Sequence, residues 1–314
     1  LKVEAMTYKY WVLRDRQICD LEMIMNGAFA PLNGFLGKND YENVLSEMRL
    51  ENGSLWPLPI MLDIDKEFSK KLTVGDKVTL KDKEGFSIAI IKIDDIWEPD
   101  LNKEAELVFG TTDCSHPGVD YLINQTNSVY IGGKIKTITM PRHYDYENLR
   151  QTPSNLKKKF EQLGWENVVA FQTRNPLHRA HVEMTLSALE EFDANLLIHP
   201  VVGMTKPGDV DHYTRVRCYE HVLDKYPNDK AMLSLIPLAM RMGGPREALW
   251  HAIIRKNYGC THLIVGRDHA GPGIDSNGNP FYGPYDAQEI LQKYEEEIGI
   301  KMVPFKFLVY LPKE

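Results

Sequence analysis

A charged turn follows a short apolar run in the segment VVAFQTRNPLHRAH, which spans residues 168–181. The run VVAF predicts a buried strand, and Gln172 and Arg174 lie just after it. Asn175 and Pro176 form a favourable helix start, with Asn as the N-cap and Pro in the first turn. The free N–H groups and the positive dipole of that helix end would converge with the Arg174 guanidinium. This combination predicts a binding site for an anion.

Arg174 is expected to dominate the electrostatics of this site. A guanidinium about 4 Å from a unit anionic charge contributes roughly 4 kcal/mol at an effective dielectric constant of about 20, whereas a helix dipole near the surface contributes roughly 0.3–1 kcal/mol. The planar fork of Arg174 also suits a tetrahedral oxyanion. His178 and His181 lie three residues apart and would be neighbours on the helix. Two alternatives stay open: Arg174 could pair with a surface carboxylate, and His178 could pack partly in the core.

A second segment, HLIVGRDHAGPG, ends another predicted strand in a glycine-containing loop. Gly266 and Gly271 let the backbone approach a ligand closely, and Arg267 and His269 add polar groups. The alternative is a plain turn. The chain contains neither GxGxxG nor GxxxxGK[ST], so we predict neither a dinucleotide fingerprint nor a P-loop.

Two further loops carry charged residues with weaker functional signals. In AMRMGGPREALWHAIIRK, a glycine pair runs into a helix, and Arg246 could either meet a ligand or only tie the loop down. In VGMTKPGDVDHYTR, the sequence supplies Lys206 and Asp209, for which an ordinary solvated turn is the preferred interpretation.

The chain has two halves with different patterns. Up to about residue 145, short β-branched runs separated by turns predict a barrel or sandwich with few helices, at 21–25 and 40–48. Beyond that point, strands and helices alternate, which predicts a parallel sheet with crossover helices. The expected strands are 168–171, 195–199, 232–237, 262–265 and 302–310, and the expected helices are 176–192, 213–225, 246–257 and 287–298.

Ligands of such sheets bind outside the carboxyl ends of the strands. We therefore expect the loops at 172–176, 200–210, 238–245 and 266–273 to share one rim.

Composition narrows the classes of function. A net charge of −7 over 314 residues argues against a generally basic nucleic-acid surface. The four cysteines are scattered without zinc spacing, which fits a reducing compartment and no structural metal. No apolar run approaches the roughly 18 residues of a membrane span, and no signal peptide is visible after Leu1. We expect a cytoplasmic protein without membrane or nucleic-acid partners.

These motifs resemble the ATP sulfurylase (sulfate adenylyltransferase) family in order and spacing. The resemblance lies in FQTRNPLHRAH, VGMTKPGDVDHYTR, AMRMGGPREALWHAIIRKNYG, GRDHAGPG and FYGPYDAQE, with GAFAPLNGFL and FGTTDCSHPGVDYL in the first half. It implies a PUA-like β domain followed by a Rossmann-like nucleotidyltransferase domain with a parallel sheet. The implied segments are 1–145, 146–304 and 305–314, the last being the start of a C-terminal subdomain that is otherwise absent.

The resemblance also implies a reaction, in which sulfate attacks the α-phosphate of MgATP in line to give adenosine 5′-phosphosulfate and pyrophosphate. Mg²⁺ would arrive with ATP, and no protein-bound metal is expected. Sulfate is already deprotonated, so no general base is needed, but cationic groups must bring two anions together. Implied partners are ATP, sulfate and pyrophosphate, a homo-oligomer, and an adenylylsulfate kinase that is fused or separate.

The resemblance carries roles over to particular residues. HRAH corresponds to the HxGH signature of nucleotidyltransferases. The implied catalytic residues are Thr173, Arg174, Asn175, His178 and His181. Sulfate would bind Gln172, Arg174 and the backbone of Ala270. ATP would bind Gln172, Thr173, Arg174, Asn175, Gly266, Arg267, Asp268 and His269. Phe305 would couple ATP binding to sulfate recognition.

One departure from the family pattern is the end of the chain at VYLPKE, where family members continue into a smaller domain with an ISGT-type motif. Two alternative functions stay open: an adenylyltransferase for another small anionic acceptor, and a nucleotide-binding regulatory module without turnover. The sequence does not choose between sulfate assimilation and ATP generation.

Overall fold

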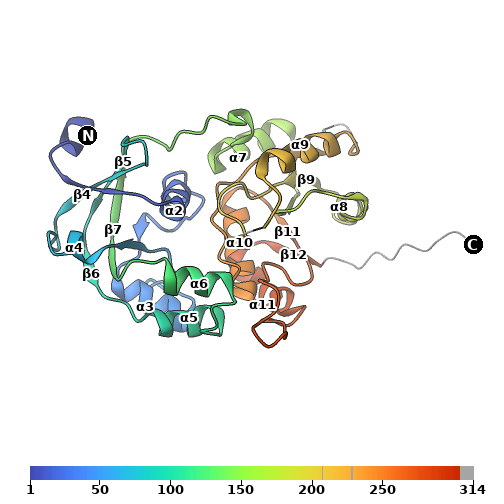
Figure 1. Cartoon of the computed structure of the whole chain (residues 1–314). Helices are drawn as coiled ribbons and strands as arrows, with labels where there is room; N and C mark the ends of the chain where they lie inside the picture. Colours follow the sequence, from blue (N-terminus) through green and yellow to red (C-terminus); the bar gives the residue numbers. More distant parts are fainter. Residues whose placement is uncertain (207, 228, 305–314) are drawn as a thin grey trace, which may run out of the picture.

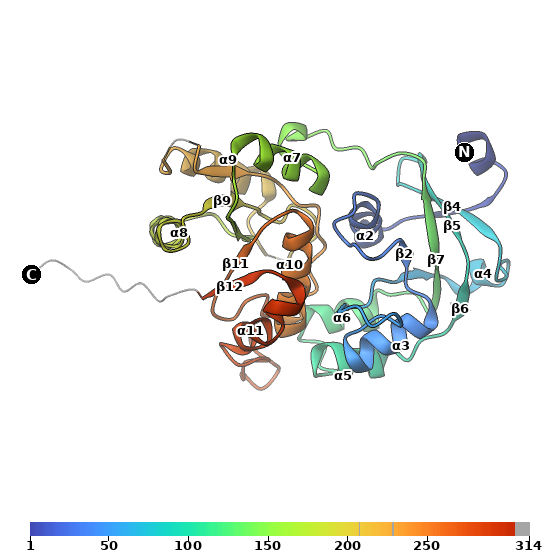
Figure 2. The same cartoon turned by 180° about the vertical axis from the view of Figure 1, so that it is seen from behind.

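The computed structural model describes residues 1–206, 208–227 and 229–304, and two sheets with their helices lie side by side in it (Figures 1 and 2). In the described residues, the first sheet has seven strands and is mixed, and the second has five and is parallel. The expected change from a β-rich half to alternating strands and helices is therefore confirmed. No helix in these residues is long and apolar enough to cross a membrane.

The first sheet is organised around its longest strand, β7. Its hydrogen-bonded path is β1-β4-β5-β7-β2, and β3 and β6 also pair with β7. Two glycines of β7 allow this crowding, because a Cβ on Gly132 would lie 2.2 Å from the Leu36 carbonyl oxygen and one on Gly133 would lie 2.0 Å from that of Lys92. The strands are β1 (Lys9–Val12), β2 (Gly34–Phe35), β3 (Leu62–Ile64), β4 (Lys77–Lys81), β5 (Ser87–Lys92), β6 (Asp95–Trp97) and β7 (Val129–Thr137).

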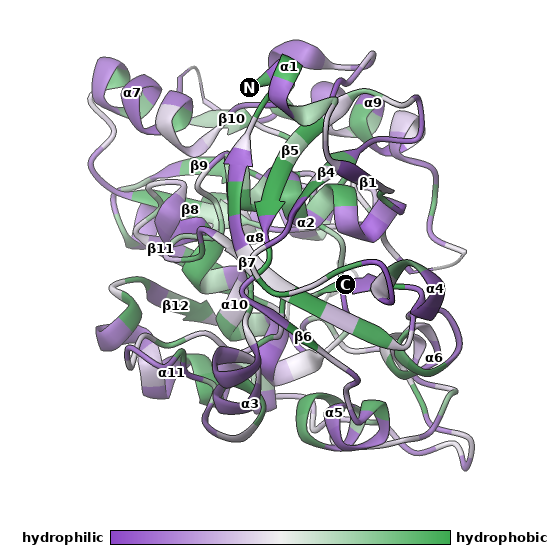
Figure 3. Cartoon of the chain, turned by 90° about the vertical axis from the view of Figure 1, so that its left-hand side faces the viewer, coloured by the Kyte–Doolittle hydropathy of each residue, from purple (hydrophilic) through white to green (hydrophobic). Residues whose placement is uncertain are grey.

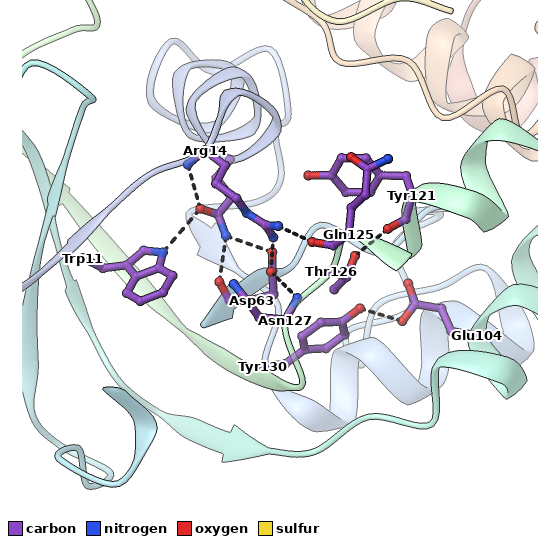
Figure 4. Close-up of polar contacts among 10 residues, drawn as sticks. Trp11, Arg14, Asp63, Glu104, Tyr121, Gln125, Thr126, Asn127 and Tyr130 are labelled. Carbon is purple, nitrogen blue, oxygen red and sulfur yellow. Dashed lines mark hydrogen bonds and ion pairs between the residues drawn. The ribbon is translucent and has the colours of Figure 1, made fainter. Parts of the chain in front are cut away.

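Buried polar contacts join the elements of this first half. Figure 4 shows Arg14 reaching Asp63, whose carboxylate also accepts the Asn127 N–H at 2.8 Å. Nearby, the buried Glu104 carboxyl accepts the Tyr130 hydroxyl at 3.0 Å. Burial raises the pKa of Glu104 to about 7. Figure 3 shows β5 as largely hydrophobic, in agreement with its buried residues 88–91.

The expectation of few helices in the first half is wrong. The helices are α1 (Lys2–Ala5), α2 (Asp15–Met25), α3 (Lys38–Glu47), α4 (Lys66–Ser69), α5 (Leu101–Phe109) and α6 (Pro117–Asn124). The missed helices carry ordinary end signals: Asp100 caps α5 through the Lys103 N–H, Gly110 ends it with φ of 73°, and the His116 ring caps α6. The β-branched runs around them outweighed these signals in the sequence pattern.

The second sheet has the order β10-β9-β8-β11-β12 with every pair parallel. The chain starts in the middle at β8, moves outward through β9 and β10, and returns to β11 on the other side of β8. This arrangement creates a topological switch point between β8 and β11. The strands are β8 (Val168–Phe171), β9 (Asn195–Ile198), β10 (Ala231–Leu233), β11 (His262–Val265) and β12 (Lys301–Pro304). Strand 302–310 is thus found as far as 304, and the rest lies outside the described residues.

Four helices connect these strands near the predicted positions: α8 (Arg179–Glu191), α9 (His212–Leu223), α10 (Gly244–Asn257) and α11 (Asp286–Ile298). The sequence analysis did not find the short 3-10 helix η1 (Glu147–Leu149) or the following helix α7 (Pro153–Leu163). Thr152 caps α7 and Pro153 opens it, while Gly164 ends it in a left-handed conformation.

Helix α10 lies at the junction of the two halves (Figure 1). Its Trp250 is fully buried, with its ring centroid 5.0 Å from that of Phe29. Asn257 donates to the carbonyls of Ala28 and Ala30 at 2.9 Å. Arg246 donates to carbonyls at the end of α3, including Val44 at 3.0 Å, so it ties the two halves together. The interpretation of Arg246 as a structural residue that ties its loop down is confirmed.

Candidate active site

A pocket of about 370 Å³ opens at the carboxyl ends of β8 and β11, which is the switch point of the second sheet. Most of its lining was predicted from the sequence: Gln172, Thr173, Arg174, Asn175, His181, Gly266, Arg267, Asp268, His269 and Ala270. Gly271, also expected near a ligand, lines the pocket too, and the other lining residues are Phe171, Met240, Ile264 and Tyr285. His178 is not among the lining residues, and Phe305 lies outside the described residues. The structure thus gathers two segments about 95 residues apart in one site.

The turn after β8 is held by local hydrogen bonds. The Thr173 hydroxyl donates to the Asn175 carbonyl at 2.9 Å and lies 3.0 Å from the Asn175 N–H. The Tyr219 hydroxyl, from α9, donates to the same carbonyl at 2.8 Å. The expected helix start at Asn175 is therefore wrong, because these partners keep its backbone in the turn. Helix α8 begins at Arg179 with His178 as its N-cap.

The two histidines of HRAH form a capping box at that helix start. The His178 N–H lies 3.4 Å from the His181 Nδ1, and the ring centroids are 3.8 Å apart. His178 is exposed, so its alternative as a core residue is wrong. His181 is half-buried and lines the pocket. Burial, and secondarily His178, lowers the pKa of His181 to about 4.

The low pKa of His181 predicts a pH-dependent interaction with anions. The ring is neutral at pH 7, and a nearby anion favours its protonated form, so the bound state has the higher pKa. Anion binding therefore takes up a proton, and affinity should rise as pH falls toward about 4. An NMR titration of the His181 ring with and without pyrophosphate measures both pKa values. Equal values in the two titrations would remove His181 from the anion site.

Arg174 forms an ion pair with Asp209, from the loop before α9. Arg174 therefore pairs with a carboxylate, as one of its two interpretations predicted, and it also lines the pocket. The second Asp209 oxygen accepts the Lys206 N–H at 3.1 Å, and Lys206 Nζ donates to the Pro272 carbonyl at 2.8 Å. Asp209 is only 11% exposed, so the interpretation as a solvated turn residue is wrong. The expectation that loops 172–176 and 200–210 share one rim is confirmed by this ion pair, although the pairing partner itself was not predicted.

An entering anion must compete with Asp209 for the Arg174 guanidinium. We expect Asp209→Asn to bind sulfate or pyrophosphate roughly two- to fivefold more tightly, because a partly exposed ion pair contributes about 0.2–1 kcal/mol. Isothermal titration calorimetry with each anion measures the change. Asp224→Asn, at an exposed carboxylate, is the matched control. Weaker binding by Asp209→Asn than by the control would contradict this competition.

The loop after β11 has an unusual backbone. Asp268 and Ala270 both have φ of 54°, in the left-handed region that non-glycine residues seldom adopt. The Gly271 N–H donates to the Asp268 carbonyl at 2.9 Å, and the Gly244 N–H donates to the Ala270 carbonyl at 3.1 Å. A Cβ on Gly266 would meet no protein atom within 4 Å, so packing does not require glycine there. Its small size keeps the pocket open for a ligand.

In the described part of the chain, no group of three or more His, Cys, Asp or Glu side chains is placed to hold a metal ion. Arrival of Mg²⁺ with ATP stays a prediction. Arg174 and Arg267 supply the permanent positive charge of the pocket lining, with Asp268 as a nearby carboxylate.

The strand order and the pocket at its switch point define a Rossmann-like α/β fold, joined here to a β-rich half. A family model described as ATP-sulfurylase matches residues 147–314, and one described as a PUA-like domain matches residues 1–140. The chain therefore belongs to the ATP-sulfurylase family.

Curated relatives of this chain are named sulfate adenylyltransferase. The chain is 54% identical to a sulfate adenylyltransferase of Schizosaccharomyces pombe, covering 100% of this chain and 64% of the relative. It is 56% identical to one of Emericella nidulans, covering 99% and 55%. Among solved structures, a hexameric APS kinase from Thiobacillus denitrificans matches with a TM-score of 0.78 and 29% identity, covering 98% of this chain and 53% of that one. The chain thus spans little more than half the length of several relatives.

Proposed function

We propose that this chain catalyses adenylyl transfer from MgATP to sulfate, giving adenosine 5′-phosphosulfate and pyrophosphate. The observation that carries the proposal is that one pocket at the switch point is lined by both Arg174 and Arg267, which come from different strand ends. Two cationic forks in one pocket suit two anions that must approach each other. The sulfate adenylyltransferase names of the relatives support the same reaction.

In this reaction, a sulfate oxygen forms a bond to the α-phosphorus while the bond from that phosphorus to the bridging oxygen of pyrophosphate breaks. The electron pair leaves with pyrophosphate, and no proton needs to move. The protein's task is therefore to hold two anions in line and stabilise charge on the phosphates. Mg²⁺ carried by ATP would offset part of the phosphate charge.

We assign the residues as follows. Gln172, Arg174 and the backbone of Ala270 bind sulfate. The ATP side comprises Thr173, Asn175, Gly266, Arg267, Asp268 and His269, with Gln172 and Arg174 shared. His181 acts at the phosphates as a hydrogen-bond donor, and binding of the anion favours its protonated form. His178 is exposed and orients His181 through the capping box.

We also propose that the whole protein acts in the cytoplasm as an oligomer and supplies its product to an adenylylsulfate kinase that is fused or separate. Similarity to a structure described as a hexameric APS kinase supports this association. Because a catalyst accelerates both directions, the same residues would also serve ATP formation from adenosine 5′-phosphosulfate.

An assay of phosphate release tests the proposed function. The chain is incubated with MgATP and pyrophosphatase, with sulfate, with molybdate or with neither. We expect release that depends on either oxyanion, since molybdate offers the same tetrahedral dianion. Release only with an organic phosphate acceptor would instead favour another adenylyltransferase. ATP binding without release would favour a regulatory module.

A further inference from the structure

A buried line of hydrogen-bonding side chains runs from α10 into the pocket wall. Glu247 and His251 lie one turn apart on α10 and are both fully buried. The Glu247 Oε1 lies 3.2 Å from the His251 Nε2. On the other side of the ring, the His251 Nδ1 lies 3.0 Å from the Nε2 of His269, which lines the pocket. None of the motif interpretations assigned a role to Glu247 or His251.

His251 also contacts the opposite side of the pocket. The Gln172 amide nitrogen lies 3.4 Å from the His251 Nε2, and the Gln172 amide oxygen is buried without a hydrogen-bond partner. With the Gln172 amide turned by 180°, its oxygen would share the His251 Nε2–H with Glu247, and its N–H₂ would occupy the buried position that the oxygen has now. One buried imidazole therefore supports residues from both strand ends, β8 through Gln172 and β11 through His269.

The partners of Glu247 fix the direction of the hydrogen bonds. Its carboxyl accepts the backbone N–H groups of Arg241 at 3.0 Å and Gly243 at 2.7 Å. Although burial opposes ionisation, His251 and these donors hold the pKa of Glu247 below its usual value, so it is a carboxylate and can only accept. Burial lowers the pKa of His251, so its ring is neutral, carries its single proton on Nε2 and accepts on Nδ1. His269 must in turn donate from Nε2, which leaves its Nδ1 without a proton.

The protonated, charged form of the His269 ring is also disfavoured. Burial, followed by His251, lowers the pKa of His269 to about 3. A neutral ring whose Nδ1 carries a lone pair accepts hydrogen bonds from hydroxyl or amino groups and repels phosphate or sulfate oxygens. A fully buried Glu–His pair in general contributes little to the free energy of unfolding. The presence of Glu247 and His251 at this position is therefore better explained by their orienting His269.

We propose that Glu247 and His251 are positioning residues that hold His269 as its Nε2–H tautomer, so that Nδ1 accepts a hydrogen bond from the nucleoside part of the ligand. The inference deepens the proposed function, on which it rests for the identity of the nucleotide. It separates the pocket into a nucleoside side at His269 and an anion side at Arg174.

Glu247→Gln tests this proposal by reversing the line of hydrogen bonds. Where the new amide nitrogen takes the Oε1 position, it gives up the Arg241 N–H and donates to the His251 Nε2, so His251 donates from Nδ1 and His269 carries its proton on Nδ1. ¹⁵N NMR of the imidazole rings distinguishes the two tautomers without any turnover. We expect Nε2–H for His251 and His269 in the unaltered chain and a change to Nδ1–H in the variant. Nδ1–H on His269 in the unaltered chain would overturn the proposal.

Ligand binding separates positioning from a merely structural role. With the tautomer reversed, we expect adenosine to bind roughly five- to tenfold more weakly and pyrophosphate to bind at least as well, since a donor replaces an acceptor. Equal weakening of both probes would indicate loosening of the pocket and overturn the proposal. Glu289→Gln, at an exposed carboxylate of α11, is the matched control.

A second variant keeps the proposal testable if Glu247→Gln does not fold. His251→Gln interrupts the line while leaving Glu247 in place, and we expect a mixture of tautomers at His269 by NMR. Retention of pure Nε2–H would overturn the proposal. Because these readouts need no sulfate-dependent turnover, a failure of the proposed reaction would appear separately in the phosphate-release assay.

Discussion

Replacing Arg174 by Ala is expected to lower kcat/KM for sulfate by about 10²–10³, the loss typical of removing one preorganised group that stabilises transition-state charge. Arg174 lines the pocket at the end of β8, and its guanidinium is held beside Asp209. The substitution removes an attractive charge and leaves the Asp209 carboxylate to repel the anions. The double variant Arg174→Ala with Asp209→Asn should therefore recover part of the loss.

Steady-state kinetics with varied sulfate measure this effect. Arg179→Ala is the control, because the Arg179 side chain is 92% exposed and pairs with Glu183 one turn along α8. That variant should retain nearly full activity. Arg174→Lys should recover little of the kcat/KM lost in Arg174→Ala, since Lys lacks the planar fork that binds an oxyanion with two donors. An Arg174→Ala chain with more than a tenth of normal kcat/KM would show that Arg174 is outside the reaction.

The second large effect concerns folding and lies at the junction of the two halves. Arg241 and Asp20 form a buried ion pair with 2.5 Å between Nη2 and Oδ2, and the side chains are 7% and 2% exposed. Removing only Arg241 leaves a buried carboxylate without its partner, which costs about 3–5 kcal/mol. We expect Arg241→Met to lower the melting temperature by on the order of 10 °C.

The same substitution predicts a pH dependence with a definite sign. Burial raises the pKa of Asp20, and Arg241 opposes that rise, so loss of Arg241 raises the folded-state pKa further. The penalty is then largest at neutral pH and shrinks as pH falls and the carboxyl takes up a proton. Thermal melts of Arg241→Met, of the double variant with Asp20→Asn, and of the exposed-site control Arg217→Met provide the comparison. A double variant less stable than Arg241→Met would contradict the argument.

The parallel sheet and most of the pocket were predictable because their signals are local. Fully apolar runs such as 168–171 predict buried strands, and helices between such runs predict parallel pairing. Once the strands are parallel, the loops after β8 and β11 must meet at one edge. The position of these loops at one rim therefore followed from the sequence pattern, whereas the site roles of Thr173, Asn175 and Ala270 were implied by the family resemblance.

The features that were missed depend on contacts that are distant in sequence. The turn at Asn175 is not a helix start because the hydroxyl of Tyr219 reaches it from α9. Asp209 looked like a solvated turn residue until the fold placed it against Arg174. Glu247 and His251 gave no signal because α10 is buried along most of its surface, so no amphipathic pattern marks the side that faces the pocket.

Isotope transfer from sulfate tests the central claim most directly. The chain is incubated with MgATP, pyrophosphatase and sulfate labelled with ¹⁸O at all four oxygens, and the nucleotide products are analysed by mass spectrometry. If a sulfate oxygen attacks the α-phosphorus, adenosine 5′-phosphosulfate will carry all four labelled oxygens and the released phosphate will carry none from sulfate. AMP without label, or no nucleotide product that depends on sulfate, would contradict adenylyl transfer to sulfate at this pocket.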